Sequence, residues 1–192
     1  MGDVKCFLFQ LSYPIFTSME FKDYFSTQAA DYARYRPDYP QELYDFILLN
    51  GTGSFAAWDC GTGNGQVAVA LAEFYERVYA TDPSAKQIDN ALKHPQVLYT
   101  VAPAEASGLP DHSMDLVTVG QAMHWFNFEE FFAEVRRVAK PGALIAVWGY
   151  GLNTISPEVD EVVNDFYFKT LDGFWPAERK YLDEHYQDIP FP

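Results

Sequence analysis

The stretch DCGTGNGQ, residues 59–66, places an aspartate before three glycines that alternate with other residues. It follows the apolar run FAAW (55–58), which is typical of a buried strand, and it leads into QVAVALAEFY (66–75), whose apolar spacing predicts a helix. Because glycine has no Cβ, a ligand can approach the backbone of such a loop closely, and the free N–H groups of the helix N-terminus can face that ligand. The pattern therefore indicates a binding loop rather than an ordinary tight turn.

Two classes of ligand compete for this loop. A dinucleotide-binding loop has the pattern G-x-G-x-x-G, which would need a glycine at position 66, where the chain has Gln66. The observed pattern D-x-G-x-G-x-G resembles instead the cofactor loop of class I S-adenosylmethionine (SAM) methyltransferases. This resemblance implies that SAM is the cofactor, that S-adenosylhomocysteine is the product, and that the loop binds SAM through Asp59, Gly61, Thr62, Gly63 and Gly65.

Residues at the ends of the next predicted strands extend the cofactor site. Asp82 ends the strand RVYATD (77–82), where its carboxylate can accept hydrogen bonds from both ribose hydroxyls; a turn or N-cap residue is the alternative. The resemblance implies that Gln87 lies beside the adenine and that Ala104 and Glu105 bind the adenine edge, although a solvated loop acid is the alternative for Glu105. The predicted set is completed by Pro83, Gln121 and Ala122.

The segment GQAMHWFNFEEFF (120–132) carries the candidates for methyl transfer. It resembles the type 11 branch of these methyltransferases, particularly trans-aconitate methyltransferase-like proteins, and the whole resemblance covers residues 19–192. His124 follows a predicted strand and is the candidate general base, while Trp125 is a candidate aromatic wall or indole N–H donor; a packing role is the alternative for each. A carboxylate acceptor is already ionised at pH 7 and needs no base, whereas a phenol, an amine or a carbon acid needs one.

Arginines are the candidates for binding anionic groups. Arg36, in DYARYRPDYP (31–40), is predicted to bind the methionine carboxylate of SAM or an acidic substrate, and Tyr32 is predicted to cover the cofactor. Arg179 is a candidate second anion partner, with a role as an ordinary surface arginine as the alternative.

Alternating strand and helix patterns must position these residues. Strands are predicted at 54–60, 77–82, 97–105, 114–122 and 143–151, and helices at 39–50, 66–75, 84–94 and 127–140, the last of which is expected to stop at Pro141-Gly142. This order predicts an α/β fold, a Rossmann-like three-layer sandwich with a mostly parallel sheet and helices on both faces. Ligands of such sheets bind at the carboxyl ends of the strands.

The domain limits leave one edge of the predicted sheet open. We expect an N-terminal extension at residues 1–18 and a SAM-dependent methyltransferase domain at residues 19–192 that lacks the C-terminal strand pair of related enzymes. The strand at 143–151 would then expose unpaired backbone groups along an apolar edge. A second copy of the chain is the predicted cover, which would give a homodimer, and residues 4–11, VKCFLFQL, are the alternative.

Composition limits the class of function. With 13 Lys and Arg against 27 Asp and Glu, the formal charge is −14, which would repel a nucleic acid backbone. The only cysteines, Cys6 and Cys60, lack metal-ligand spacing and suit a reducing cytoplasm, and no apolar run approaches the ~20 residues of a membrane span.

The sequence predicts a cytoplasmic SAM-dependent methyltransferase without a metal, acting on a small molecule, with a carboxylate as the leading acceptor. A SAM-binding module without turnover and a nicotinamide-dependent oxidoreductase are the alternatives.

Overall fold

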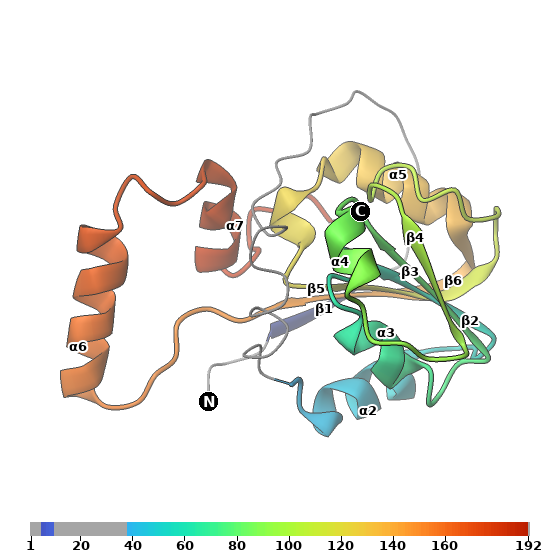
Figure 1. The fold of residues 1–192 in the computed structure, drawn as a ribbon, viewed down its shortest axis with the longest axis horizontal. Coiled ribbons are helices and arrows are strands. Elements are labelled where there is room, and N and C mark those ends of the chain that lie inside the picture. The colour runs from blue at the N-terminus through green and yellow to red at the C-terminus, as the bar shows by residue number, and fades with distance from the viewer. Residues whose placement is uncertain (1–4, 10–37, 192) are drawn as a thin grey trace.

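A computed structural model describes residues 5–9 and 38–191 of the chain. These residues form a six-stranded sheet in the order β1-β6-β5-β2-β3-β4. All neighbouring pairs are parallel except β1 and β6. Helices α2 and α3 lie on one face of the sheet and α5 lies on the other (Figure 1), so the predicted three-layer α/β architecture is confirmed.

The strands and helices expected from the sequence are all present, with shorter bounds for most. The strands are β2 Ala56–Cys60, β3 Arg77–Asp82, β4 Val97–Val101, β5 Met114–Gly120 and β6 Ala139–Gly149, and the helices are α2 Gln41–Asn50, α3 Gln66–Leu71, α4 Ala85–Asp89 and α5 Phe128–Val138. The prediction that the last helix continues to Pro141-Gly142 is wrong, because β6 begins at Ala139 and runs through both residues. A register shift in β5 between Met114 and Leu116 accommodates this irregular start.

The centre of the sheet is buried on both faces. Every residue of β2 and of β5 is buried, as expected for parallel strands that lie between two layers of helices. One apolar cluster, which includes Phe131 and Val135 of α5, lies on one side of these strands, and a second cluster, which includes Ile47 of α2 and Leu71 of α3, lies on the other. This packing fixes the carboxyl ends of the central strands, where the predicted site residues lie.

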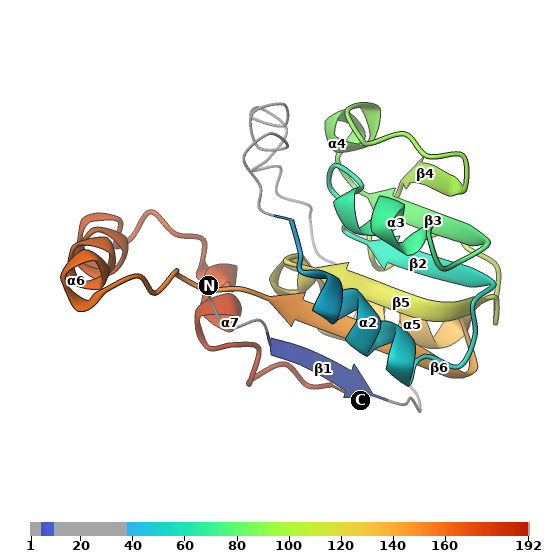
Figure 2. The same cartoon turned by 90° about the horizontal axis from the view of Figure 1, so that it is seen from below.

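The outer edge of β6 is covered by the chain's own N-terminal segment. Strand β1, Lys5–Phe9, pairs antiparallel with β6 from Gly149 back to Ile145, as Figure 2 shows. The prediction that a second copy covers this edge is therefore wrong, and residues 5–9 of the alternative segment, 4–11, lie there. A chain of 28 residues, the number that separates β1 from residue 38, can span roughly 90 Å when extended, which is more than the width of a six-stranded sheet, so an N-terminal strand can reach this edge.

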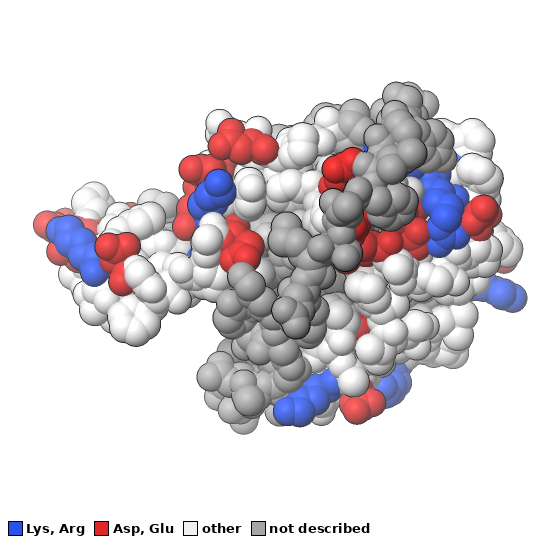
Figure 3. Space-filling model, turned by 90° about the horizontal axis from the view of Figure 1, so that it is seen from above, with Lys and Arg blue, Asp and Glu red and all other residues white. Residues whose placement is uncertain are grey.

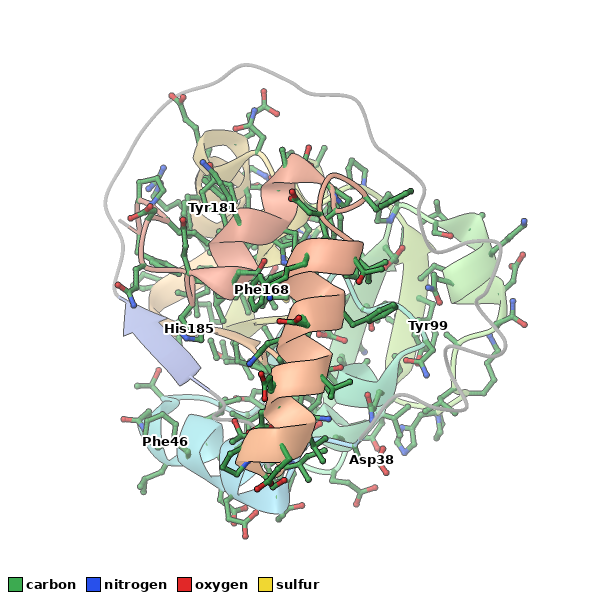
Figure 4. All side chains as sticks on the ribbon, turned by 90° about the vertical axis from the view of Figure 1, so that its left-hand side faces the viewer. Asp38, Phe46, Tyr99, Phe168, Tyr181 and His185 are labelled. Carbon is green, nitrogen blue, oxygen red and sulfur yellow. The ribbon has the colours of Figure 1, made fainter. Side chains whose placement is uncertain are left out.

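The segment after β6 divides into two parts. Helix α6, Pro157–Asp165, projects away from the sheet in Figures 1 and 2 and has no buried residue. It continues into the π-helical turn η2, Phe166–Thr170, and Figure 4 looks onto this stretch, where Phe168 is labelled. The short helices η3, Ala177–Arg179, and α7, Lys180–Asp183, follow, and here the chain returns to the core through buried Leu182 and Tyr186.

Acidic side chains gather in patches on one face of the described part. On the face in Figure 3, Asp and Glu side chains form several patches over the body of the molecule, in line with the formal charge of −14. Over residues 5–9 and 38–191, no helix combines the length and the apolar character that crossing a membrane requires. The same residues contain no group of three His, Cys, Asp or Glu side chains arranged to hold a metal ion. The expected boundary between residues 18 and 19 lies outside the described residues.

Candidate cofactor and acceptor site

The loop between β2 and α3 has a backbone that requires its glycines. Gly61, Gly63 and Gly65 have φ values of +68°, +56° and +82°, in the left-handed region that residues with a Cβ rarely adopt. A Cβ on Gly61 would lie 2.6 Å from the Cβ of Ala122, and a Cβ on Gly65 would fall on the Tyr99 hydroxyl. The predicted glycine loop is thus held against the segment after β5 and against β4.

Asp59, near the end of β2, connects this loop to the neighbouring strand β5. It is 1% exposed, its Oδ2 accepts a hydrogen bond from the Thr62 hydroxyl at 2.5 Å, and its Oδ1 accepts one from the Thr118 hydroxyl at 3.0 Å. Thr118 lies on β5 directly beside Asp59 in the parallel register. Asp59 therefore ties the loop to the neighbouring strand, and its contact with a cofactor stays a prediction.

Asp82 joins the loop to the end of the next strand. Its Oδ2 accepts a hydrogen bond from the Gly63 N–H at 2.9 Å, and its Oδ1 accepts one from the Ser84 N–H at 2.9 Å. Asp82 is only partly buried, so its carboxylate lies at the edge of the glycine loop and not in the core. The structure therefore brings Asp82, with Pro83 beside it, to the glycine loop as the sequence predicts.

Two buried amide oxygens near this loop receive no hydrogen bond from the part of the chain that the structure describes. Gln87 in the first turn of α4 is 4% exposed and Asn64 in the loop is 7% exposed. No described residue donates a hydrogen bond to Gln87 Oε1 or to Asn64 Oδ1. Buried acceptors are rarely left unpaired in folded proteins, so a ligand with hydrogen-bond donors would suit these two atoms. The amino and hydroxyl groups of SAM are such donors, and the residues present fit this cofactor.

The loop between β4 and β5 is anchored to α5. Glu105 Oε1 accepts a hydrogen bond from the backbone N–H of Asn127, the N-cap residue of α5, at 2.8 Å. Two residues later, the Ser107 N–H donates to Glu134 Oε1 of α5 at 2.8 Å. The carboxylate of Glu105 is thereby placed at a helix N-terminus, where negative charge is favoured, and Ala104 beside it is buried.

A turn after β5 directs His124 into the interior. Gln121 has a φ of +59°, and it donates hydrogen bonds from its N–H to the Trp148 carbonyl and from Nε2 to the Tyr150 carbonyl, both at 2.9 Å. The short helix η1, Met123–Trp125, follows. His124 is 5% exposed, and its Nδ1 lies 3.0 Å from the Tyr186 hydroxyl.

His124 and Tyr186 are both uncharged at neutral pH. Burial and, to a smaller extent, the positive charge of Arg179 lower the pKa of His124 to about 4, although Glu178 acts in the opposite direction. Burial also raises the pKa of Tyr186. A tyrosine hydroxyl that donates to Nδ1 leaves the proton of the neutral imidazole on Nε2, as a hydrogen-bond donor. The Trp125 ring lies 4.7 Å from the His124 ring, centroid to centroid, so the two candidates are neighbours.

Of the predicted site residues, two lie outside the described part of the chain, Tyr32 and Arg36. The other predicted cofactor and catalytic residues lie at or just after the carboxyl ends of β2, β3, β4 and β5, with Gln87 in the first turn of α4. Arg179 lies apart from them in η3. Sequence reasoning missed Tyr186, Thr118 and Asn127, which position His124, Asp59 and Glu105. They are distant from their partners along the chain, Tyr186 by 62 residues, and no local motif marks them.

Comparison with known proteins identifies the family. The family model described as "Methyltransferase domain" matches residues 58–147. A protein of Dictyostelium discoideum named "Putative methyltransferase" is 39% identical over 180 residues, which cover 92% of this chain and 68% of that protein. An "Uncharacterized methyltransferase" of Schizosaccharomyces pombe is 34% identical, and the match covers 68% of this chain but only 54% of that protein.

A solved structure supports the same conclusion. The structure of a "Putative Type II Methyltransferase" from Anaeromyxobacter dehalogenans has 48% sequence identity and a TM-score of 0.75, and the match covers 82% of this chain and 67% of that chain. The residues matched by the family model, 58–147, include the glycine loop, Asp82 at the end of β3 and His124 in η1. The chain therefore belongs to the class I SAM-dependent methyltransferase family.

Proposed function

We propose that this protein transfers a methyl group from SAM to a small molecule, and that the accepting group is a carboxylate. The observation that carries the first part is the bond between Asp82 and the Gly63 N–H, because it places a partly exposed carboxylate at the glycine loop. SAM, when bound, supplies an electrophilic methyl group that forms a bond to the acceptor oxygen as the S–C bond breaks, which leaves S-adenosylhomocysteine.

The residues proposed to hold SAM divide by their chemistry. The glycine loop would contact SAM through its backbone, and Asp82 would accept hydrogen bonds from the ribose hydroxyls. Gln87, whose buried oxygen has no donor among the described residues, would accept a hydrogen bond from the cofactor, and Ala104 and Glu105 would lie at the adenine edge. Gln121 and Ala122 would border the cofactor site beside the loop. We assign Tyr32 to covering the cofactor and Arg36 to binding the methionine carboxylate of SAM.

The environment of His124 supports a carboxylate acceptor. An efficient general base has a pKa near the working pH, whereas the pKa of His124 is lowered to about 4. A carboxylate is ionised without help and attacks the methyl group directly. In this proposal the chain aligns the acceptor and excludes water, and His124 donates a hydrogen bond from Nε2 while Trp125 forms a wall of the site. The resemblance to trans-aconitate methyltransferase-like proteins points to the same acceptor group.

The first experiment is calorimetric titration of the full chain with SAM and, separately, with NAD. We expect binding of SAM and none of NAD. Asp82→Ala should weaken SAM binding by on the order of 1.5 to 3 kcal/mol per lost hydrogen bond, and Gly63→Val should abolish it. Asp89→Ala, on the exposed side of α4, is the matched control and should bind SAM normally. Unchanged SAM affinity in both site variants would disprove the cofactor assignment.

A second experiment separates a base from a hydrogen-bond donor at His124. Formation of S-adenosylhomocysteine is measured with a panel of small carboxylic acids, phenols and amines. Loss of a general base lowers turnover by ~100-fold or more, so His124→Ala should have a clearly smaller effect on a carboxylate substrate. Turnover of a phenol or an amine, with a loss of that size in His124→Ala, would overturn the carboxylate proposal and support the base.

A cytoplasmic location, a domain at residues 19–192 and the absence of nucleic acid substrates stay predictions from the sequence.

A further inference from the structure

Arg179 lies in an aromatic clamp, which we define as the side chains of Tyr167 and Trp175. The guanidinium carbon lies 5.1 Å from the centroid of the Tyr167 ring and 4.6 Å from that of the Trp175 ring. Its Nε donates to the Tyr167 hydroxyl, which in turn donates to Asp183 Oδ1 at 2.9 Å. With 26% of the side chain exposed, Arg179 is held in one orientation, unlike an ordinary surface arginine.

These contacts use only one edge of the guanidinium. The Nε edge faces Tyr167 and Asp183, whose Oδ1 lies 3.8 Å from Nε. Within residues 5–9 and 38–191, no acceptor binds Nη1 or Nη2. The edge formed by these two nitrogens is planar and matches the two oxygens of a carboxylate, or two oxygens of a phosphate. The clamp therefore presents a ready anion-binding group.

The same guanidinium lies close to the proposed acceptor site. It is near enough to His124 for its charge to lower the pKa of the imidazole, and this effect is larger than the opposite effect of Glu178. Seven residues further along the chain, Tyr186 forms the hydrogen bond to His124. In Figure 1, α7 lies next to the segment that joins β5 to α5, which contains His124. Arg179 thus supplies a local positive charge in a chain of formal charge −14.

We propose that Arg179 is a specificity-determining residue that binds an anionic group of the acceptor, separate from the atom that receives the methyl group. The inference rests on the proposed function. Methylation of a carboxylate oxygen removes its negative charge, so a group held by Arg179 would lose its partner as the reaction proceeds. A second anionic group keeps its charge throughout, and its binding orients the reacting group towards the cofactor. A carboxylate and a phosphate share the required chemistry.

The test uses the full chain with bound S-adenosylhomocysteine, titrated at low salt with succinate, inorganic phosphate and the neutral analogue succinamide. We expect one or both anions to bind and succinamide not to bind. Arg179→Gln should weaken anion binding about tenfold or more, which is the scale of one lost charge-assisted hydrogen bond. Arg77→Gln, an exposed arginine at the start of β3, is the matched control and should bind as the wild type does. Tighter succinate binding would identify a carboxylate, and tighter phosphate binding a phosphate group.

Two conservative variants test the clamp itself. Tyr167→Phe keeps the ring but removes the hydroxyl that accepts from Nε, so anion binding should fall severalfold. Arg179→Lys keeps the charge but loses the planar edge, and it should bind between the wild type and Arg179→Gln. Full binding by Arg179→Lys would show that charge alone suffices and would overturn recognition by the planar edge.

SAM affinity, measured in the same proteins, separates the two proposals. If the wild type binds SAM but neither anion, or if Arg179→Gln binds both anions normally, the assignment of Arg179 is wrong and the proposed function stands. If the wild type does not bind SAM, the proposed function itself fails.

Discussion

The glycine loop after β2 and the segment after β6 both border the site, but they are held in different ways. The loop begins from a strand that is buried at every residue, and its shape is fixed by Asp59, by Asp82 and by three left-handed glycines. The segment after β6 contains a helix, α6, without a single buried residue, and it joins the core cluster at Leu182, Tyr186 and Ile189.

This difference separates two tasks. A SAM-binding loop must fit one cofactor, and here its geometry follows from the central strands of the sheet. The proposed acceptor side combines His124 with side chains from the segment after β6, most of which lies outside the sheet. We therefore expect substitutions in the loop to affect stability and SAM binding together, and substitutions in the later segment to affect acceptor binding alone.

The largest effect is expected from Gly61→Val. Its φ of +68° opposes any residue with a Cβ, and the new Cβ would lie 2.6 Å from that of Ala122. The backbone strain and the clash should together lower the free energy of unfolding by roughly 2 to 5 kcal/mol and abolish SAM binding. Urea unfolding and SAM titration measure both. Gly108→Val is the control, because its φ of +72° gives the same strain but nothing lies within 4 Å of its Cβ. Equal effects at both glycines would refute the clash.

The next effect concerns His124 and pH. In the unfolded chain a histidine has a pKa of about 6.5, whereas in the folded protein that of His124 is about 4. Between these values the unfolded chain binds a proton that the folded protein does not, so stability falls as the pH decreases through this range, by about 3 kcal/mol in total. Urea unfolding at several pH values measures this slope. His124→Gln should flatten it, and a slope that persists in this variant would show that other groups cause it.

The fold was predictable where a local pattern determines it. The apolar runs of β2 and β5 mark central parallel strands, and the glycine pattern after Asp59 marks the loop. The start of β6 was not predictable, because the helical pattern of α5 runs on into Lys140 and Pro141-Gly142 is typical of a helix end. Strand β6 nevertheless contains Pro141 and Gly142, and its pairing with β5 is irregular at this point.

Contacts between distant parts of the chain set the other limits. The pairing of β1 with β6 joins residues near opposite ends of the chain, and nothing in VKCFLFQL specifies which edge it would meet. Likewise, the sequence showed that His124 follows the end of a strand. It did not show that Tyr186 is its hydrogen-bond partner or that burial lowers its pKa. A site residue's identity can be inferred from a motif, whereas its pKa depends on the packing around it.

A smaller effect is expected from Val117→Ala in β5. Val117 is completely buried beside the strand that leads to the glycine loop. The loss of two side-chain carbon atoms, together with the cavity that remains, should lower the free energy of unfolding by roughly 2 kcal/mol. Urea unfolding gives this value, and SAM titration shows whether the loop is disturbed as well. A loss below about 0.5 kcal/mol would mean that the sheet repacks more easily than its burial indicates.

The smallest effect is expected from the same substitution in α6, Val162→Ala. Val162 is 69% exposed, and the neighbouring Val159 is 41% exposed, so little apolar contact is lost. Alanine also has a higher helix propensity than valine, which offsets that loss. The free energy of unfolding should change by less than about 0.5 kcal/mol, with unchanged SAM affinity. Because Val117→Ala removes the same atoms, the two variants differ only in their surroundings. A loss in Val162→Ala as large as that in Val117→Ala would show that α6 is buried against another surface in solution, and the contrast between the two regions would no longer hold.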